Sequence, residues 1–308
     1  MAKGLIIRST GSWYDVRDEE GHIWQARLKG KFKIKGLQTS NPLAVGDRVS
    51  MEIENESENT AVIGKIEERD NYIARASVHK TAQAHLLAAN LDQALLIVTL
   101  DFPRTSLGFI DRFLVSAESF RIPVTIAFHK QDIFDEEGRD QHQPIMEMYA
   151  ALGYGTIRTS AFTGEGIDEL RAFLHGKITL VSGHSGVGKS TLVNTIAPGL
   201  ELRTGEVSTF ANKGVHTTTF AEMFEIEPDT FLIDTPGIKE LGLIDMEPAE
   251  ISHYFPEMRE LLNECRFHNC LHVNEPACAV RDAVEEGRIA ASRYHSYLGM
   301  LDGNDNRR

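Results

Sequence analysis

The sequence Gly183-His184-Ser185-Gly186-Val187-Gly188-Lys189-Ser190 decides the fold class of this chain. It has the GxxxxGKS pattern of a phosphate-binding loop, in which glycines let backbone N–H groups wrap around phosphate oxygens. Lys189, a candidate catalytic residue, is expected to reach the β and γ oxygens of a nucleotide, and the Ser190 hydroxyl to bind Mg²⁺. The apolar run at 178–182 predicts a buried strand before the loop, and Ser190-Thr191 begins a predicted helix after it. The motif therefore predicts a nucleotide-binding α/β domain.

A second motif, Asp234-Thr235-Pro236-Gly237, follows another strand-like run at residues 230–233. A carboxylate at this place lies at the carboxyl end of a strand, where ligands bind in open α/β sheets. We therefore expect Asp234 to hold the hydration shell of the Mg²⁺ ion and the Gly237 N–H to contact the γ-phosphate. On its own the motif is typical of an ordinary turn. Behind a phosphate loop it indicates a nucleoside triphosphatase.

The motif that recognises the base comes before the phosphate loop instead of after it. His129-Lys130-Gln131-Asp132 follows a strand-like run at 124–128 and matches (N/T)KxD except at its first residue; Ser160-Ala161 follows at a suitable distance. The Asp132 carboxylate can accept hydrogen bonds from the ring N–H and the exocyclic amine of guanine, a pair that adenine lacks. We expect Lys130 to lie along the base and Ser160-Ala161 to complete the pocket. Because GTPases normally carry these motifs in the opposite order, the chain is predicted to be a circularly permuted GTPase.

The departure at His129 affects the expected base pocket. An imidazole can donate to a loop carbonyl or to the base, but its geometry differs from that of an amide, and one ring nitrogen ordinarily titrates near neutrality. The alternatives are a solvated polar turn at this motif, or an ATPase. Asp132 argues against the ATPase, so we keep a preference for guanine.

Residues 1–72 predict a small all-β module of OB type, a fold whose strands and loops bind oligonucleotides. Its alternating segments lie at residues 11–16, 22–27 and 47–53, with a polar hairpin tip at 54–59. The aromatic residues Trp13, Tyr14, Trp24 and Phe32 are candidates either for base stacking or for the core of the barrel.

A basic stretch at residues 27–36 is the best candidate for local contact with RNA. Its cations alternate with Phe32 and Ile34 at the period of a strand, which predicts one basic face. The alternative is a solvated strand face with its apolar residues in the core.

All three cysteines of the chain lie near its carboxyl end, in the pattern CxxxxCxHxxxxxC. Thiolates and imidazole are the ligands of structural zinc, so we expect Cys265, Cys270, His272 and Cys278 to bind one Zn²⁺, with His268 as a substitute for His272. The alternative is a set of buried reduced thiols. The ion would clamp helical segments at 248–262 and 279–301. Residues 302–308 are expected to be disordered.

Length and composition fit a soluble multidomain protein. The chain has 308 residues, of which 42% are hydrophobic and 25% charged, and a net charge of −13. That charge argues against indiscriminate binding to nucleic acid. We see no signal peptide and no apolar run long enough for a membrane span, which favours a cytoplasmic protein. The predicted domains are 1–72 (OB-like, RNA-binding), 73–246 (permuted GTPase) and 247–308 (helical, zinc-binding).

Together these motifs resemble the RsgA (YjeQ) family of bacterial GTPases that depend on the small ribosomal subunit. The resemblance covers nearly the whole chain: an OB-like front, a permuted centre with KxD, SA and GHSGVGKST, and the zinc pattern. It implies a late assembly or checkpoint factor of that subunit, with ribosomal RNA and proteins as partners of the outer domains. A single-copy ribosomal partner favours a monomer.

The resemblance also implies catalytic residues. Ile238 stands after DxxG, where many GTPases carry a Gln that orients water, so intrinsic turnover is expected to be slow. The family has a GRHTTT-like switch whose histidine is thought to position water, and this chain matches it except that Val215 replaces Arg. His216 is therefore the candidate catalytic residue, and Thr218 the expected Mg²⁺ or γ-phosphate ligand, with Thr217 as the near alternative.

Two other classes of function stay open. A timed scaffold would dock in a nucleotide-dependent way with negligible turnover, and an RNA-binding protein with a vestigial GTPase would bind the small subunit equally without GTP. The motif order also suggests that loss of a γ-phosphate contact at Asp234–Gly237 shifts the zinc domain.

Overall fold

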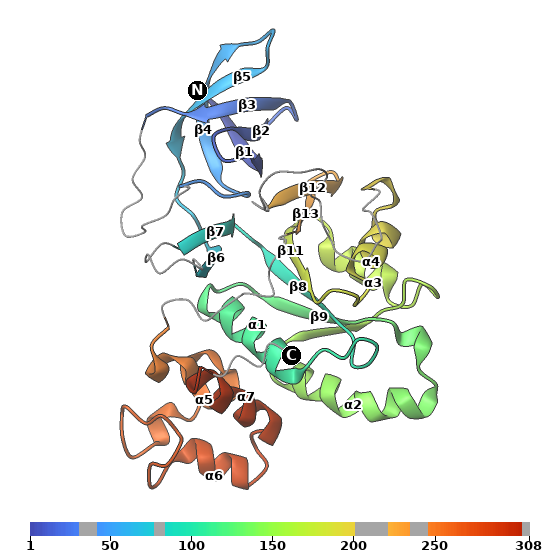
Figure 1. Ribbon diagram of the computed structural model, residues 1–308, viewed down its shortest axis with the longest axis vertical. Coiled ribbons are helices and arrows are strands. Elements are labelled where there is room, and N and C mark those ends of the chain that lie inside the picture. The colour runs from blue at the N-terminus through green and yellow to red at the C-terminus, as the bar shows by residue number, and fades with distance from the viewer. Residues whose placement is uncertain (31–41, 77–83, 201–220, 235–245, 304–308) are drawn as a thin grey trace.

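The computed structural model describes residues 1–30, 42–76, 84–200, 221–234 and 246–303. Within these ranges, an N-terminal barrel and a C-terminal helical domain lie at opposite ends of a central α/β domain (Figure 1). Several residues of the predicted sites lie outside the described ranges: Phe32, Ile34, Val215, His216, Thr217, Thr218, Gly237 and Ile238.

The barrel consists of five strands: β1 (Ala2–Ser9), β2 (Tyr14–Asp18), β3 (Ile23–Leu28), β4 (Arg48–Asn55) and β5 (Thr60–Ile66). Their order is β1-β2-β3-β5-β4, and pairing of β1 with β4 closes the sheet. The β3–β5 pair is parallel and the other pairs in the barrel are antiparallel. This arrangement confirms the predicted OB-type barrel.

Burial decides the role of two of the candidate aromatic residues. Tyr14 and Trp24 point into the barrel core, where the Trp24 Nε1–H donates to Asp18 Oδ2 at 2.8 Å. They are therefore core residues and do not form a stacking surface. Trp13 is exposed. The sequence predicted β2, β3 and β4 to within a few residues but did not predict β1 or β5.

The described part of the basic stretch is paired with acidic residues of β4. Arg27 binds Glu54 at 2.8 Å, and Lys29 binds Glu52 at 3.3 Å, all with exposed side chains. For these two cations the solvated strand face is the better interpretation. Residues 31–36 lie outside the described ranges.

In its described residues, the central domain has a sheet of six strands in the order β10-β9-β8-β11-β13-β12, among which only β12 is antiparallel to its neighbour in this domain. Its strands are β8 (Gln93–Val98), β9 (Val124–Phe128), β10 (Gly155–Arg158), β11 (Ile178–Gly183), β12 (Glu222–Glu227) and β13 (Thr230–Asp234). Its helices are α1 (Leu107–Ser119), α2 (Glu136–Ala151), α3 (Ile167–Leu174) and α4 (Lys189–Ile196), with short 3₁₀ helices η1 (Gln131–Ile133) and η2 (Pro198–Leu200).

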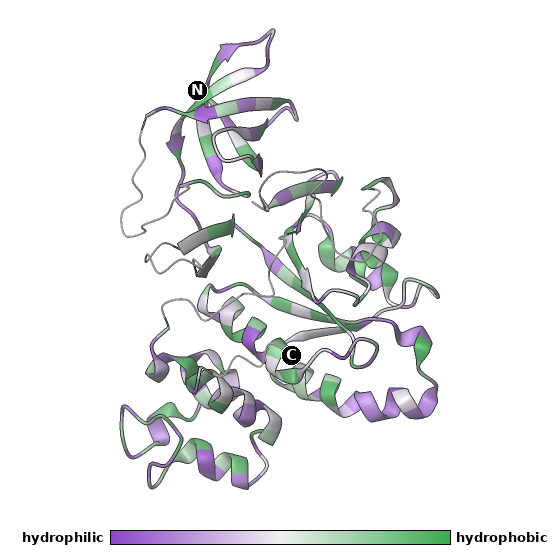
Figure 2. Cartoon of the chain, viewed as in Figure 1, coloured by the Kyte–Doolittle hydropathy of each residue, from purple (hydrophilic) through white to green (hydrophobic). Residues whose placement is uncertain are grey.

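Helices cover both faces of this sheet, so the residues of its central strands β8 and β9 are buried on both faces. In β8, Leu96 and Val98 face the core beneath α1 and α2, whereas Leu95 and Ile97 face the core beneath α3 and α4. Figure 2 shows the central strands as mostly hydrophobic, while the N-terminal half of α2 is hydrophilic and solvent-facing. The strands that precede the base motif and the phosphate loop, β9 and β11, both pair with β8. Because all three are parallel, the two motifs meet at one edge of the sheet.

A short antiparallel ribbon, β6 (Tyr72–Ala76) and β7 (Ala84–Ala89), connects the barrel to the central domain. The barrel loop before β4 is hydrogen-bonded to the end of this ribbon, with Ala89 N–H donating to Val45 O and Asn90 Nδ2 to Gly46 O, both at 2.8 Å. Gly46 has a φ of 91°, and a Cβ there would lie 2.0 Å from the Ala89 carbonyl oxygen. The joint therefore requires glycine at this position.

The barrel and the central sheet are also continuous through strand pairing. β1 pairs with β12 where Arg8 lies opposite Glu222. The predicted boundary after residue 72 falls at the start of β6, and the domain limits stay predictions.

The helical domain comprises η4 (Pro248–Tyr254), α5 (Pro256–Arg259), η5 (Leu262–Glu264), α6 (Ala279–Glu285) and α7 (Ala291–Leu301). Gly287, with a φ of 75°, lies between α6 and α7 and ends the helix that the sequence predicted as one segment. The domain packs on α1, since Val115 belongs to its core. Within the described ranges, no helix combines the length and apolar character that a membrane span needs.

Candidate nucleotide-binding and metal sites

The phosphate loop, residues 183–190, connects β11 to α4 at the carboxyl edge of the sheet. Gly186 and Gly188 have φ angles of 85° and 95°, in the left-handed region where a side chain is strained. A Cβ added to Gly183 would lie 2.6 Å from the carbonyl oxygen of Ile97 in β8. The glycines are thus required by the backbone, which can present its N–H groups to phosphate together with the first turn of α4.

Lys189 and Asp234 lie side by side at the loop. Asp234 ends β13, next to β11, and its Oδ1 forms an ion pair with Lys189 Nζ. Ser190 is the next residue of α4. Its hydroxyl and the Asp234 carboxylate are oxygen donors of the kind that Mg²⁺ prefers, so these residues fit a Mg²⁺ ion beside a bound phosphate.

Two loops follow β9 and β10 at the same edge of the sheet; we call residues 129–135 the first base loop and 159–166 the second. Lys130 in the first loop has a left-handed φ of 60° and donates from Nζ to the carbonyl oxygens of Gly186 at 2.7 Å and Phe102 at 2.8 Å. Lys130 therefore joins the first base loop to the phosphate loop. Phe102 contributes to this joint only through its backbone carbonyl group, so the residue type gives no signal in the sequence.

Asp132 and Ser160 meet between the two base loops. Asp132 is exposed in η1, and its Oδ1 accepts a hydrogen bond from the buried Ser160 hydroxyl at 2.5 Å. Ser160 Oγ also accepts from the backbone N–H groups of Phe162 and Thr163, at 3.2 and 3.1 Å. This fixes one carboxylate oxygen of Asp132 and leaves the carboxylate facing outward. Ala161 is half-buried beside it.

His129 is almost completely buried against the phosphate loop. Its Nδ1 lies 3.0 Å from the Thr159 hydroxyl, and a Cβ on Gly188 would be 2.8 Å from its ring. Burial lowers the pKa of His129 to about 4. The sequence led us to expect that this ring titrates near neutrality. That expectation is wrong, because burial moves its pKa well below neutral pH. Its ring, at the start of the first base loop, packs against the phosphate loop.

The remaining phosphate-loop residues differ in burial. Val187 is buried and His184 lies against Phe109 of α1, with ring centroids 3.7 Å apart. Ser185 and Thr191 are exposed. Gln131 is buried, and its N–H donates to the Thr159 carbonyl at 3.2 Å, so it holds the first base loop.

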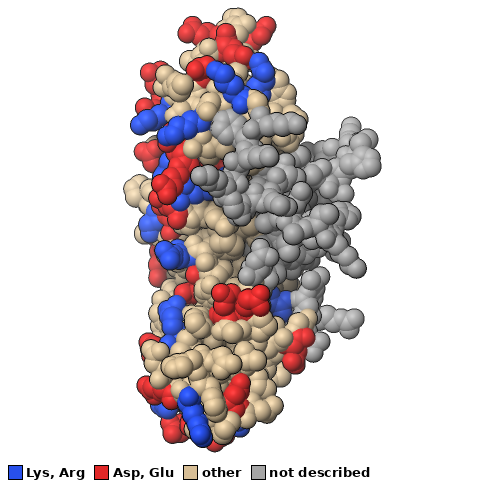
Figure 3. Space-filling model, turned by 90° about the vertical axis from the view of Figure 1, so that its left-hand side faces the viewer, with Lys and Arg blue, Asp and Glu red and all other residues tan. Residues whose placement is uncertain are grey.

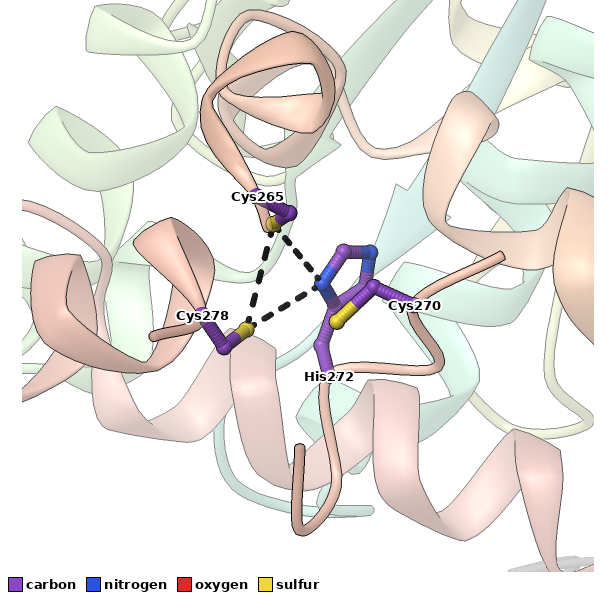
Figure 4. Close-up of side chains that lie close together, drawn as sticks. All are labelled: Cys265, Cys270, His272 and Cys278. Carbon is purple, nitrogen blue, oxygen red and sulfur yellow. Dashed lines mark hydrogen bonds between the residues drawn. The ribbon is translucent and has the colours of Figure 1, made fainter. Parts of the chain in front are cut away.

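The three cysteines and His272 form one cluster, whose ligand atoms all lie within 4.8 Å of one another (Figure 4). His272 Nδ1 is 3.3 Å from Cys278 Sγ and 3.6 Å from Cys265 Sγ, and points at the thiols. Burial raises the pKa of the Cys270 thiol to about 12, so the thiolate form needs a cation beside it. Three thiols and one imidazole nitrogen thus fit a tetrahedral metal site. The substitute ligand His268 is exposed and is not part of the cluster.

Neighbouring groups hold the loop that carries His272. The Glu275 carboxylate accepts hydrogen bonds from the backbone N–H groups of Leu271, Val273 and Asn274, at 2.8, 2.9 and 3.0 Å. The Tyr297 hydroxyl of α7 donates to the Leu271 carbonyl at 2.7 Å. The ligand loop is therefore preformed by residues around the cluster.

Comparison with known proteins identifies the family of this chain. The chain matches the family model of the RsgA GTPase over residues 66–244 and that of the RsgA N-terminal domain over residues 3–63. A protein of Bacteroides fragilis named small ribosomal subunit biogenesis GTPase RsgA is 52% identical over 98% of this chain and 97% of its own length.

Two solved structures share the whole architecture. The crystal structure of YjeQ from Thermotoga maritima has a TM-score of 0.78 at 36% identity, covering 100% of this chain and 99% of that chain. The crystal structure of YloQ, a circularly permuted GTPase, has a TM-score of 0.75 at 28% identity, covering 100% and 96%.

Proposed function

The chain belongs to the RsgA family and is a circularly permuted GTPase. We propose that it hydrolyses GTP to GDP and phosphate at a late step in assembly of the small ribosomal subunit. The observation that carries the proposal is the Lys130 hydrogen bond to the Gly186 carbonyl. It joins the first base loop to the phosphate loop, so one nucleotide can span both.

This geometry supports a role for each residue in binding the nucleotide. Asp132, held by Ser160, accepts two hydrogen bonds from guanine, and the Lys130 stem lies along the base. When GTP binds, Lys189 exchanges its ion pair with Asp234 for the β and γ oxygens, where it stabilises the charge of the transferred phosphoryl group. Ser190 and Asp234 would hold a Mg²⁺ ion, which would supply positive charge to the phosphates.

Hydrolysis also needs a group that orients the attacking water. We assign this role to His216, with Thr218 on the Mg²⁺ ion and the Gly237 N–H on the γ-phosphate; all three lie outside the described residues. Since Ile238 cannot orient water, intrinsic turnover is slow and the partner must stimulate it.

We assign one structural Zn²⁺ to Cys265, Cys270, His272 and Cys278. Bound by these four residues, a zinc ion would supply cross-links that a small domain with little hydrophobic core lacks, and the ligands would hold the loops between η5 and α6 together.

The proposed partner is the small ribosomal subunit, contacted by the barrel and the helical domain, with the protein acting as a cytoplasmic monomer. On the face shown in Figure 3, basic and acidic side chains are intermixed over both outer domains. With a net charge of −13, such a surface favours local contacts with RNA over indiscriminate binding.

Hydrolysis of GTP and of ATP by the zinc-loaded protein, each with and without small ribosomal subunits, tests the proposal. Strong stimulation of GTP turnover alone would support both the base preference and the partner. Absence of stimulation would favour the timed scaffold, and equal use of ATP would contradict the role of Asp132. Equal affinity for the subunit in the GTP-like and GDP states would contradict nucleotide control of docking.

A further inference from the structure

Arg139 connects the two base loops. It lies in the first turn of α2, and its guanidinium donates to both carboxylate oxygens of Glu165 in the second base loop, at 3.1 and 2.9 Å. The same guanidinium donates to the carbonyl oxygen of Gln131 in the first base loop at 3.0 Å. One side chain from a helix thus binds both loops that recognise the base.

Both contacts of Arg139 connect directly to residues of the proposed base pocket. Gln131 directly precedes Asp132, and the Ser160 N–H donates to the Glu165 carbonyl at 3.0 Å. Asp132 is exposed, and the hydrogen bond from Ser160 connects it to the second loop. The direction of the Asp132 carboxylate therefore depends on the spacing of the two loops, which Arg139 connects.

A bidentate arginine–carboxylate pair is well suited to this task. Charge-assisted double hydrogen bonds fix orientation as well as distance, and both side chains are only about one-third exposed, at 32% and 31%. Guanine discrimination needs such precision, because one carboxylate must meet the ring N–H and the exocyclic amine together.

We propose that Arg139 and Glu165 form a clamp that sets guanine specificity by positioning Asp132. The proposal rests on the proposed GTPase function and adds two positioning residues to it, neither of which touches the nucleotide. Loosening the clamp should weaken both carboxylate bonds to guanine. Hypoxanthine lacks the exocyclic amine and makes only one of them, so its binding should suffer less.

Calorimetric titration of GDP, IDP and ADP into the zinc-loaded full chain tests the clamp, with Arg139→Met and Glu165→Gln as variants. We expect GDP affinity to fall about tenfold in Arg139→Met, IDP affinity to fall less, and the GDP/IDP ratio to drop accordingly. In steady-state assays the KM for GTP should rise while kcat at saturating GTP stays within twofold.

Arg171→Met is the matched control. Arg171 in α3 also pairs with an acid, Asp168 at 3.2 Å, and donates to a backbone carbonyl, that of Thr195 at 3.2 Å, but it contacts neither base loop. It should leave the GDP/IDP ratio unchanged. If Arg139→Met does not fold, Arg139→Lys keeps the charge without the fork and should lower the ratio by a smaller factor.

An unchanged GDP/IDP ratio in the folded variants would overturn the clamp, whether both affinities fall equally or neither falls. Failure of the wild-type protein to prefer GDP over ADP would instead overturn the guanine-specific function on which the clamp rests.

Discussion

Replacing Arg293 with Met should detach the helical domain from the central domain. Arg293 in α7 is 1% exposed; it binds Asp111 of α1 at 2.7 Å and Glu257 of α5 at 2.7 and 3.2 Å. Its guanidinium also lies 4.6 Å from the centre of the Phe255 ring, and the Tyr149 hydroxyl of α2 donates to Asp111 at 2.8 Å. Helices α1, α2 and α7 and the short helix α5 therefore meet around this cation.

The expected loss of unfolding free energy depends on the two carboxylates that stay buried after Arg293 is replaced. Asp111 is fully buried and Glu257 is 8% exposed, so Arg293→Met leaves two buried carboxylates without their cation. Breaking a buried pair in this way costs about 3–5 kcal/mol. Burial already raises the pKa of Asp111, and loss of Arg293 should raise it further. Because a carboxyl with a raised folded pKa is destabilising once it ionises, the loss should be greatest at neutral pH and shrink as pH falls.

Urea unfolding monitored by circular dichroism at pH 7.5 measures this loss. Neutralising the carboxylates as well, in Asp111→Asn/Glu257→Gln/Arg293→Met, should recover part of it, because no uncompensated charge then remains buried. The two tryptophans of the chain both belong to the barrel: Trp13 lies between β1 and β2, and Trp24 lies in β3. The urea midpoint of their fluorescence should therefore not change, and it serves as the internal control. A loss below about 1 kcal/mol, or no recovery in the triple variant, would refute the reasoning.

Four further predictions concern other parts of the molecule. Gly46→Ala should lower the free energy of unfolding, measured by thermal unfolding, by about 2 kcal/mol or more, because its Cβ would lie 2.0 Å from a carbonyl oxygen. The control Gly176→Ala has a φ of the same sign but open space around it, and should cost about 1 kcal/mol. Equal losses in the two variants would contradict the clash. His129 has a folded pKa of about 4 against 6.5 unfolded, so it should remove up to about 3 kcal/mol of stability as pH falls from 6.5 to 4, and His129→Asn should flatten that part of the urea-midpoint profile. Cys278→Ser should reduce zinc measured by atomic absorption from one ion per chain to nearly none and abolish hydrogen-exchange protection in α6 and α7; retained zinc would exclude this ligand. His216→Ala should lower subunit-stimulated GTP hydrolysis at least about a hundredfold and leave GDP affinity within twofold, and lost affinity would indicate a structural role instead.

Local patterns were sufficient to predict the sites that depend on adjacent residues. The phosphate loop and Asp234 could be predicted because each follows an apolar strand whose end must lie at the ligand edge of the sheet. The metal cluster could be predicted because its four ligands fall within 14 consecutive residues, Cys265–Cys278. The choice between His268 and His272 needed the structure, since spacing allows either.

Properties that depend on distant residues could not be predicted. Arg139 meets Glu165 only because β9 and β10 pair in the sheet, and neither residue type is unusual for an exposed loop or helix. The low pKa of His129 comes from burial against Gly188, which the motif does not encode. Strand β1 could not be predicted because buried and exposed residues do not alternate regularly along it. Different parts of this strand pair with β2, β4 and β12.

The pairing of β1 with β12 connects the barrel to the strand that comes directly after residues 201–220 in the chain. Arg17 strengthens this connection through an ion pair with Glu225 at 3.0 Å. Coupling between two binding sites is reciprocal, so any factor by which a ligand on the barrel changes GTP affinity is also the factor by which GTP changes the affinity of that ligand. If the barrel binds RNA as proposed, titrating the nucleotide with and without that RNA would measure the same coupling free energy as titrating the RNA with and without the nucleotide.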